Sequence, residues 1–111
     1  MLLTRELIDK LRANAEQSSS GARDHFPIVK LFAPDGAATW LFTELLPDED
    51  TLFGLCDLGL GSPEIGYASL AELSARRGRF GLLIERDRHF GASKPLSEYA
   101  AEARRKGRIV A

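Results

Sequence analysis

The first part of the chain has the pattern of an amphipathic helix. Apolar residues from Leu7 to Ala15 recur at helical spacing, so they share one face of a helix that we expect over residues 4–16. Thr4 can cap this helix, because its hydroxyl can accept from the free amides of the first turn. Residues 17–26 are polar, with three serines and a glycine, and predict a loop.

Four later stretches have the composition of β-strands. β-Branched, aromatic and leucine side chains dominate each of them, and they span residues 28–32, 39–45, 52–58 and 80–87. Pro34-Asp35-Gly36 is a turn that makes an antiparallel hairpin of the first two. Residues 59–66 are a loop or a short additional strand.

Alternation along the second strand assigns its side chains to two faces. Trp40, Phe42 and Glu44 share one face in this pattern. Glu44 then either lies at the edge of an apolar pocket beside two aromatic rings or faces solvent near the strand end. The second interpretation is favoured.

A short helix is expected after the third strand. Ser69 and Glu72 have the spacing of a capping box, and Gly78 is a natural C-terminal stop. Arg76 and Arg77 would then lie in its last turn, where they complement the helix dipole.

A third helix, with the sequence EYAAEARRK, is expected near the C-terminus. It starts at Pro95 or is capped by Ser97, it ends at Gly107, and Tyr99 packs inward. Residues 108–111 form a tail, which is flexible in one interpretation and a short strand in the other.

The order of these elements predicts an α+β fold with a mainly antiparallel sheet of about four to five strands flanked by three helices. A chain of 111 residues suits a single domain, residues 1–111, with enough buried surface for one core but not two. No apolar run approaches the ~20 residues of a membrane span, and charges interrupt the N-terminal stretch where a signal peptide would be apolar. We therefore expect a cytoplasmic protein with no membrane contact.

Charge is distributed unevenly along the chain. Residues 1–75 contain five Lys or Arg and twelve Asp or Glu, whereas residues 76–111 contain ten and four, so a net −7 is followed by a net +6. In the favoured interpretation the two parts pack together and neutralise each other. In the other, the C-terminal third binds nucleic acid or another polyanion through its basic residues, Arg76, Arg77, Arg79, Arg104, Arg105, Lys106 and Arg108.

The stretch LFGLCDLGLGSPEIGY, residues 52–67, contains the only cysteine and four of the ten glycines. Its GxGxxxxG spacing, interrupted by Pro63 and not followed by a helix, does not fit a dinucleotide fingerprint, and the Gly-Lys-Ser/Thr of a P-loop is absent. Cys56 has a carboxylate beside it and no base, so we interpret it as a small core residue. Asp57 caps a turn, the favoured interpretation, or pairs with Glu64 for a cation or for acid–base chemistry.

One cysteine and two separate histidines do not have the spacing of a metal site, and we expect no cofactor. The candidate recognition residues come from the second strand, from the glycine-rich stretch and from the charged ERDRH segment. They are Glu44, Asp57, Gly59, Gly61, Glu64, Tyr67, Arg86, Asp87 and His89.

Short motifs over nearly the full length also carry a family resemblance. They are Leu2-Leu3-Thr4, Val29-Lys30-Leu31-Phe32, Ala38-Thr39-Trp40-Leu41, Thr43-Glu44, Gly54-Leu55-Cys56-Asp57-Leu58-Gly59, Pro63-Glu64, Gly66-Tyr67, Glu85-Arg86-Asp87 and Lys94-Pro95-Leu96-Ser97. As a set they resemble a bacterial family of small proteins described as a domain of unknown function. The resemblance implies carriage on plasmids and integrative elements, often near antirestriction genes. It implies a role in element transfer, maintenance or defence evasion, and it brings no catalytic residues with it.

Three functions are compatible with the sequence. The first is a non-enzymatic module of a mobile element that binds an unknown protein partner, or a second copy of itself, through the acidic turn 47–50, the 59–66 stretch and residues 85–89. The second is a nucleic-acid-binding accessory protein that uses the basic C-terminal third. The third is a small carboxylate- or metal-dependent hydrolase, which predicts that its acidic and imidazole side chains converge in one pocket, namely Glu44, Asp57, Glu64 and His89.

Overall fold

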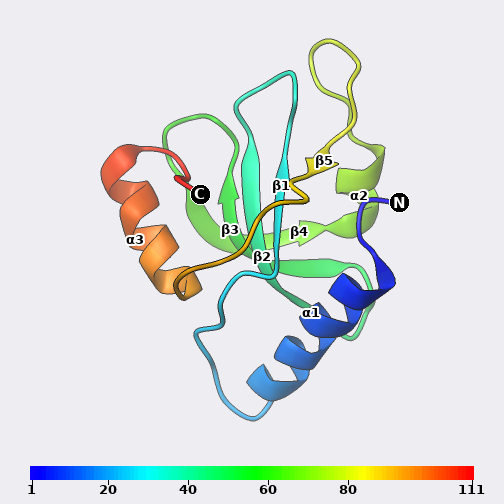
Figure 1. Ribbon diagram of the computed structural model, residues 1–111, viewed down its shortest axis with the longest axis vertical. Helices are drawn as coiled ribbons and strands as arrows, with labels where there is room; N and C mark the ends of the chain where they lie inside the picture. Colours follow the sequence, from blue (N-terminus) through cyan, green and yellow to red (C-terminus); the bar gives the residue numbers. More distant parts are fainter.

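The computed structural model describes residues 1–111 and has an α+β fold, as the sequence predicts. A five-stranded antiparallel sheet with the order β4-β3-β2-β1-β5 is flanked by three helices (Figure 1). The elements, in chain order, are α1 (Arg5–Ser18), β1 (Val29–Phe32), β2 (Thr39–Leu45), β3 (Thr51–Asp57), β4 (Glu64–Ser69), α2 (Leu70–Ala75), β5 (Glu85–Arg86) and α3 (Leu96–Lys106).

The sheet separates two hydrophobic clusters. On one face, Leu11 of α1 and Leu73 of α2 belong to a cluster of 11 buried residues around Trp40. On the other face, α3 contributes Ala103 to a cluster of 7 buried residues that includes Leu41. The expectation of one core is therefore wrong, because helices cover both faces of the sheet and each face buries its own set of side chains (Figure 1).

A β-bulge at Thr43 changes which side chains of β2 share a face. Phe42 pairs with Gly54 of β3, whereas the next paired residue is Glu44, opposite Phe53. The extra residue reverses the alternation beyond it. Glu44 therefore points to the α3 face, and its predicted grouping with the aromatic side chains of β2 is wrong.

The predicted caps at the N-termini of α1 and α2 are present. The hydroxyl of Thr4 accepts from the Leu7 amide at 3.2 Å, and that of Ser69 accepts from the Glu72 amide at 3.1 Å. However, α2 ends at Ala75, so the arginines that follow lie outside its last turn.

The C-terminal helix begins and ends close to the predicted residues. Pro95 is its N-cap and makes no side-chain capping bond, so neither of the two predicted starts is correct. The helix ends at Gly107, which has a φ of 75° in the left-handed region that favours glycine. No strand follows: Ile109 is buried in the α3-side cluster.

The strand predicted over residues 80–87 shrinks to the two residues of β5. The loop before it is held by the β1–β2 turn, because Asp35 Oδ2 accepts from the amides of Phe80 at 2.7 Å and Leu82 at 3.3 Å. A Cβ on Gly78 would lie 1.7 Å from Asp35 Oδ1, so only glycine allows this approach. β1, the neighbour of β5, ends at Phe32, and Leu83 pairs with Arg77 instead, so the stretch before β5 is not part of the sheet.

The sequence predicted either a loop or a short strand after the glycine-rich turn. The structure has a strand of six residues there, β4.

None of the three helices is both long enough and apolar enough to cross a membrane.

Candidate functional site

The strand β4 forms one edge of the sheet, and β3 is its only neighbour. Its six residues, EIGYAS, contain no lysine and no proline, and Glu64 is the only charged residue among them. Natural edge strands usually carry such residues, or bulges, to prevent pairing with another chain. The outward backbone groups of β4 are therefore open to an additional strand.

Exposed apolar side chains surround this open edge. The largest exposed fractions are those of Leu60, 83%, and Tyr67, 66%, followed by Leu58 with 54%. Large apolar side chains that gather at one place on a surface are typical of interaction sites. We call the β4 strand together with the exposed apolar residues of its hairpin, Leu58, Leu60, Ile65 and Tyr67, the β4 edge surface.

Two of these side chains lie on the sheet face that carries α3. Ile65 pairs with Leu55 and Tyr67 pairs with Phe53, and directly opposed residues of antiparallel strands point to the same face. The rings of Phe53 and Tyr67 stack at a tilt, with their centroids 5.2 Å apart. An aromatic and aliphatic strip therefore continues from the α3-side cluster out to the edge.

A groove of about 450 Å³ lies between this strip and α3. Phe53 and Ile65 line it from the sheet, and Arg23 lies in the loop segment that also lines it. From α3 come residues at helical spacing, including Ala100 and Arg104. The groove combines an apolar lining with two arginine side chains.

The hairpin that leads into β4 is held in place by a buried carboxylate. Asp57 is 2% exposed, and its two oxygens accept from the amides of Gly59 at 2.8 Å and Ile109 at 3.0 Å. Gly59 and Gly61 have positive φ values of 80° and 86°. The favoured role of Asp57 as a turn cap is confirmed.

Asp57 does not form a pair with Glu64. Glu64 is opposite Cys56 in the sheet and is exposed, while Asp57 points to the other face and towards the C-terminal tail. Burial raises the pKa of the half-buried Cys56 thiol to about 11, which disfavours the reactive thiolate at neutral pH.

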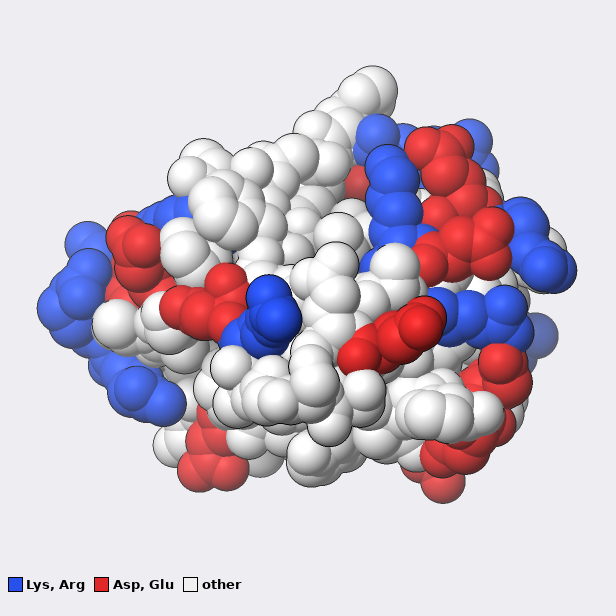
Figure 2. All heavy atoms as spheres, turned by 90° about the horizontal axis from the view of Figure 1, so that it is seen from below, with Lys and Arg blue, Asp and Glu red and all other residues white.

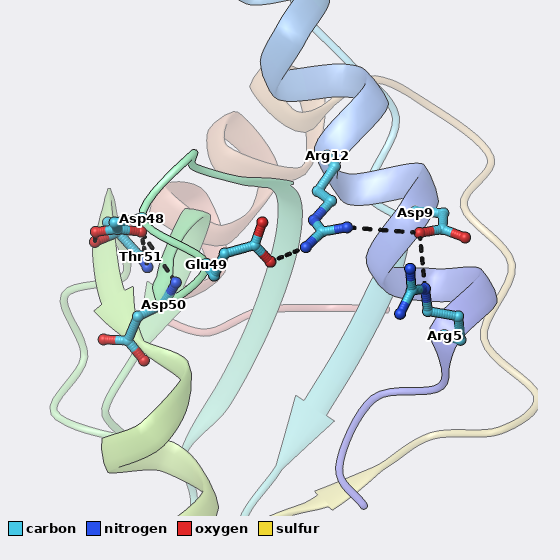
Figure 3. A network of polar contacts seen from close by, with 7 residues as sticks. All are labelled: Arg5, Asp9, Arg12, Asp48, Glu49, Asp50 and Thr51. Atoms are coloured by element: carbon cyan, nitrogen blue, oxygen red, sulfur yellow. Dashed lines mark hydrogen bonds and ion pairs between the residues drawn. The ribbon is translucent and has the colours of Figure 1, made fainter.

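The acidic turn before β3 uses its carboxylates within the protein (Figure 3). Asp48 accepts from the amide and the hydroxyl of Thr51, and the side-chain bond is the main reason why the pKa of Asp48 is lowered. Glu49 forms an ion pair with Arg12 of α1. Asp50 accepts from the Ser69 hydroxyl at 2.7 Å, which ties the end of β4 to the turn.

The charged segment around β5 lies at the opposite edge of the sheet from β4. A guanidinium nitrogen of Arg86 donates to the Leu2 carbonyl, and Asp87 is 3.7 Å from the ammonium group of Lys30. His89 is exposed, and its amide donates to Asp87. Apart from Glu44, the predicted recognition residues are therefore divided between two edges of the sheet that three strands separate.

Glu44 lies apart from both edges and is only 7% exposed, so the favoured solvent-facing interpretation is wrong. It accepts from the Ser18 hydroxyl at 3.0 Å, and the same hydroxyl is 3.1 Å from the ring of His25. The carboxylates and the histidine named for a hydrolase thus occupy four separate environments. No group of three or more His, Cys, Asp and Glu side chains is arranged to hold a metal ion.

The basic residues of the C-terminal third also form two groups. Arg104, Arg105 and Lys106 lie at the end of α3, on the left in Figure 1, whereas Arg76 follows α2 on the right. Figure 2 shows Lys and Arg at the outer left end with some Asp and Glu beside them, and both charges interspersed at the right end.

These basic residues are not neutralised by the acidic part of the chain. The only ion pair that joins the two parts is Lys30–Asp87, in which the basic residue comes from the acidic part. Arg76 lies over the ring of Trp40 at 5.6 Å, and Arg79 lies at the same distance over Phe80. The favoured expectation is therefore confirmed only in part: the two parts of the chain pack together in the α3-side cluster, but no basic residue of 76–111 forms an ion pair with an acidic residue of 1–75.

The fold and this surface define a small α+β protein with an open sheet edge and no assembled set of catalytic side chains. The chain belongs to the family described as "Protein of unknown function (DUF2958)", whose match spans residues 2–110. No curated protein and no solved structure matches the chain.

Sequence reasoning named Tyr67 and Glu64 but, apart from Arg104, missed the lining of the groove, including Arg23, Phe53 and Ile65. The signal for Ile65 was present, because EIGYAS places two large apolar side chains at a spacing of two residues. Arg23 had no comparable signal, since its loop meets α3 only in the folded chain.

Proposed function

We propose that this protein is a non-enzymatic interaction module that binds another protein by adding a strand of the partner to β4. The observation that carries the proposal is the coincidence of an unprotected six-residue edge strand with exposed Leu60, Ile65 and Tyr67. In strand addition, backbone hydrogen bonds provide affinity and side-chain contacts on alternate residues provide specificity. The β4 edge surface offers both.

The rigidity of the hairpin supports this function. Asp57 fixes the entry to β4, and Asp50 fixes its end through the Ser69 hydroxyl. An edge strand held at both ends loses little conformational entropy when a partner binds, which favours affinity.

The resemblance of the chain to proteins of plasmids and integrative elements suggests the kind of partner. We propose a cytoplasmic component of element transfer, maintenance or host defence. This part of the proposal rests on the resemblance alone, whereas the location of the binding surface rests on the geometry of β4.

Affinity capture from a lysate of bacteria that carry such an element tests the binding surface. The bait is compared with the Tyr67→Lys variant, which adds a charge to an exposed position of the edge strand. Partner recovery, measured by quantitative mass spectrometry, should fall by about tenfold or more, because a lysine protects an edge against strand addition.

Glu85→Lys is the matched control, since it adds the same side chain to an exposed position of the opposite edge strand. It should retain the partner. Circular dichroism must show that both variants are folded. A partner that Tyr67→Lys retains and Glu85→Lys loses would place the interface at β5 and contradict the proposal.

Nucleic-acid binding is a second candidate function, and one observation favours it. Arg104, Arg105, Lys106 and Arg108 are exposed at one end of the molecule and make no ion pair within 4.0 Å. Fluorescence anisotropy with single- and double-stranded DNA tests it. Binding that falls steeply as salt rises would support it, and no binding at low salt would remove it.

A further inference from the structure

We infer that the groove between β4 and α3 binds an extended segment of a partner protein that has an apolar centre and carboxylates on both sides of it. This inference rests on the proposed strand addition at β4 and specifies the chemistry of the added strand. It is carried by the lining of the groove and by the charges at its rim.

The helix α3 leaves part of its sheet face uncovered. It packs over Leu41 and Leu55 in the middle of the sheet, whereas Ile65 of β4 is 37% exposed. A strand added to β4 would direct every second side chain to this face. The side chain at its centre would lie beside Ile65, which lines the groove together with Phe53, so an aliphatic residue fits there best.

Two arginines line the groove without an acidic partner. Neither Arg23 nor Arg104 is within 4.0 Å of a carboxylate. The one acidic residue of the lining, Asp24, is already engaged, because its two oxygens accept from the amide and the hydroxyl of Ser97. Guanidinium groups bind carboxylates in charge-assisted pairs, so acidic residues of a partner complement this rim.

The wider surface has the same charge preference. Arg105 and Lys106 follow on α3 beyond the groove, and of the two acidic residues of this helix Glu102 is already paired with Lys94. An acidic segment is therefore also attracted over a distance of about a Debye length, ~8 Å at physiological salt.

A second copy of the chain fits the groove less well. Its β4 strand could supply Ile65 and Tyr67, but its only charged residue, Glu64, lies on the opposite face of the strand. Pairing of two β4 strands would therefore leave Arg23 and Arg104 without carboxylates. The charge of the groove favours a partner segment of different sequence.

A synthetic probe separates these possibilities. The probe is a fluorescein-labelled peptide of about eight residues, the length of a strand, in which valine and threonine alternate and a glutamate stands at each end. Its matched control has glutamine at each end. Binding to the full chain is measured by fluorescence anisotropy at low and at physiological salt.

The glutamate peptide should bind about five- to tenfold more tightly than the glutamine peptide, as expected for charge-assisted pairs at a partly exposed rim. The double variant Arg23→Gln/Arg104→Gln should lose this difference. Arg88→Gln, which changes an exposed arginine near β5, should keep it. Tyr67→Lys should weaken the binding of both peptides, because it changes the edge strand β4 to which they are added.

Equal binding of the two peptides, or no binding of either, would overturn the inference about the acidic segment. So would a β4-dependent dimer in analytical ultracentrifugation that excludes the peptide. The proposed strand addition is judged separately by the capture experiment with Tyr67→Lys, so failure of the one is distinguishable from failure of the other.

Discussion

The two edges of the sheet are built in opposite ways. At the β5 edge, the strand has only two residues; charged side chains form it and follow it, and the exposed apolar residues nearby lie in the loop before it. The Arg86 side chain donates to the Leu2 carbonyl, and the Asp87 amide donates to the Lys30 carbonyl. At the β4 edge, the strand has six residues, and apolar side chains such as Tyr67 are exposed beside it.

This difference shows which edge is available to a partner. A short edge with charged residues that already bind other parts of the chain is protected against further pairing. A longer edge without such protection exposes apolar surface at a free-energy cost of roughly 25 cal/mol per Å². A partner that covers the β4 edge recovers this energy along six residues of strand, whereas β5 offers only two residues for pairing, although Phe80, Leu82 and Leu83 are exposed in the loop before it.

The largest expected effect separates the inner strand from the edge strand. A Cβ on Gly54 of β3 would lie 2.0 Å from the Leu41 carbonyl oxygen, whereas a Cβ on Gly66 of β4 would meet nothing within 4 Å. Gly54→Ala should therefore lower the free energy of unfolding by about 2–3 kcal/mol, the usual cost of overpacking. Gly66→Ala, its control, should change it by less than about 0.5 kcal/mol.

Equilibrium unfolding in urea measures both values. A Gly66→Ala variant that is as unstable as Gly54→Ala would contradict the view that β4 has open space on its surface.

A smaller effect is expected at the hairpin that leads into the β4 edge. Asp57→Asn replaces one acceptor oxygen by an NH₂ group, so either Gly59 or Ile109 loses its bond and faces another donor. We expect a loss of about 2 kcal/mol, the cost of an unsatisfied buried group. Hydrogen exchange should become faster at the Ile109 or Gly59 amide, and unchanged exchange at both would refute the role of Asp57 as a clamp.

At the β5 edge, a single charged contact contributes less. Arg86→Ala removes the bond to the Leu2 carbonyl and should lower the free energy of unfolding by about 1 kcal/mol. Arg88→Ala is the control, because Arg88 is exposed and makes no hydrogen bond or ion pair in the structure. Thermal unfolding followed by circular dichroism compares the two, and equal midpoints would show that the contact does not protect this edge.

The smallest effect concerns acid and the turn that holds the end of β4. Hydrogen bonds from Thr51 lower the pKa of Asp48 below its ordinary value of 3.8. A lowered folded-state pKa adds stability above the unfolded value, and this stability is lost as the pH falls through the folded value. Urea midpoints should thus fall below about pH 4 in the wild type and less in Asp48→Asn. If the urea midpoints of the wild type and of Asp48→Asn fell in parallel as the pH is lowered, this contribution of Asp48 would be contradicted.

The sequence allowed most of the secondary structure to be predicted because its signals are local. Thr4 and Ser69 cap their helices wherever these pack, and Gly107 ends α3 because it accepts a positive φ. The alternation that marks β2 likewise depends only on neighbouring residues. For the candidate site, the sequence indicated the stretch from Asp57 to Tyr67 but not the groove beside it.

Contacts between distant segments decided the rest. The bulge at Thr43 depends on how β2 pairs with β3, and it moved Glu44 to the other face of the sheet. Most of the strand predicted over residues 80–87 is a loop, because its neighbour β1 ends at Phe32 and because Leu83 pairs with Arg77, while Asp35 binds the amides of Phe80 and Leu82. Neither event has a local signal, since each depends on which backbone groups meet after folding.

By itself, the sequence determined the helices and most of the strands, the α+β class and the uneven distribution of charge. Only the tertiary structure decided that the basic residues at the end of α3 form no ion pair, that Arg23 and Arg104 line one groove, and that β4 is left open as an edge. The physical reason is that local conformation depends on neighbours within a few residues, whereas an edge or a groove exists only once strand order and helix packing are set.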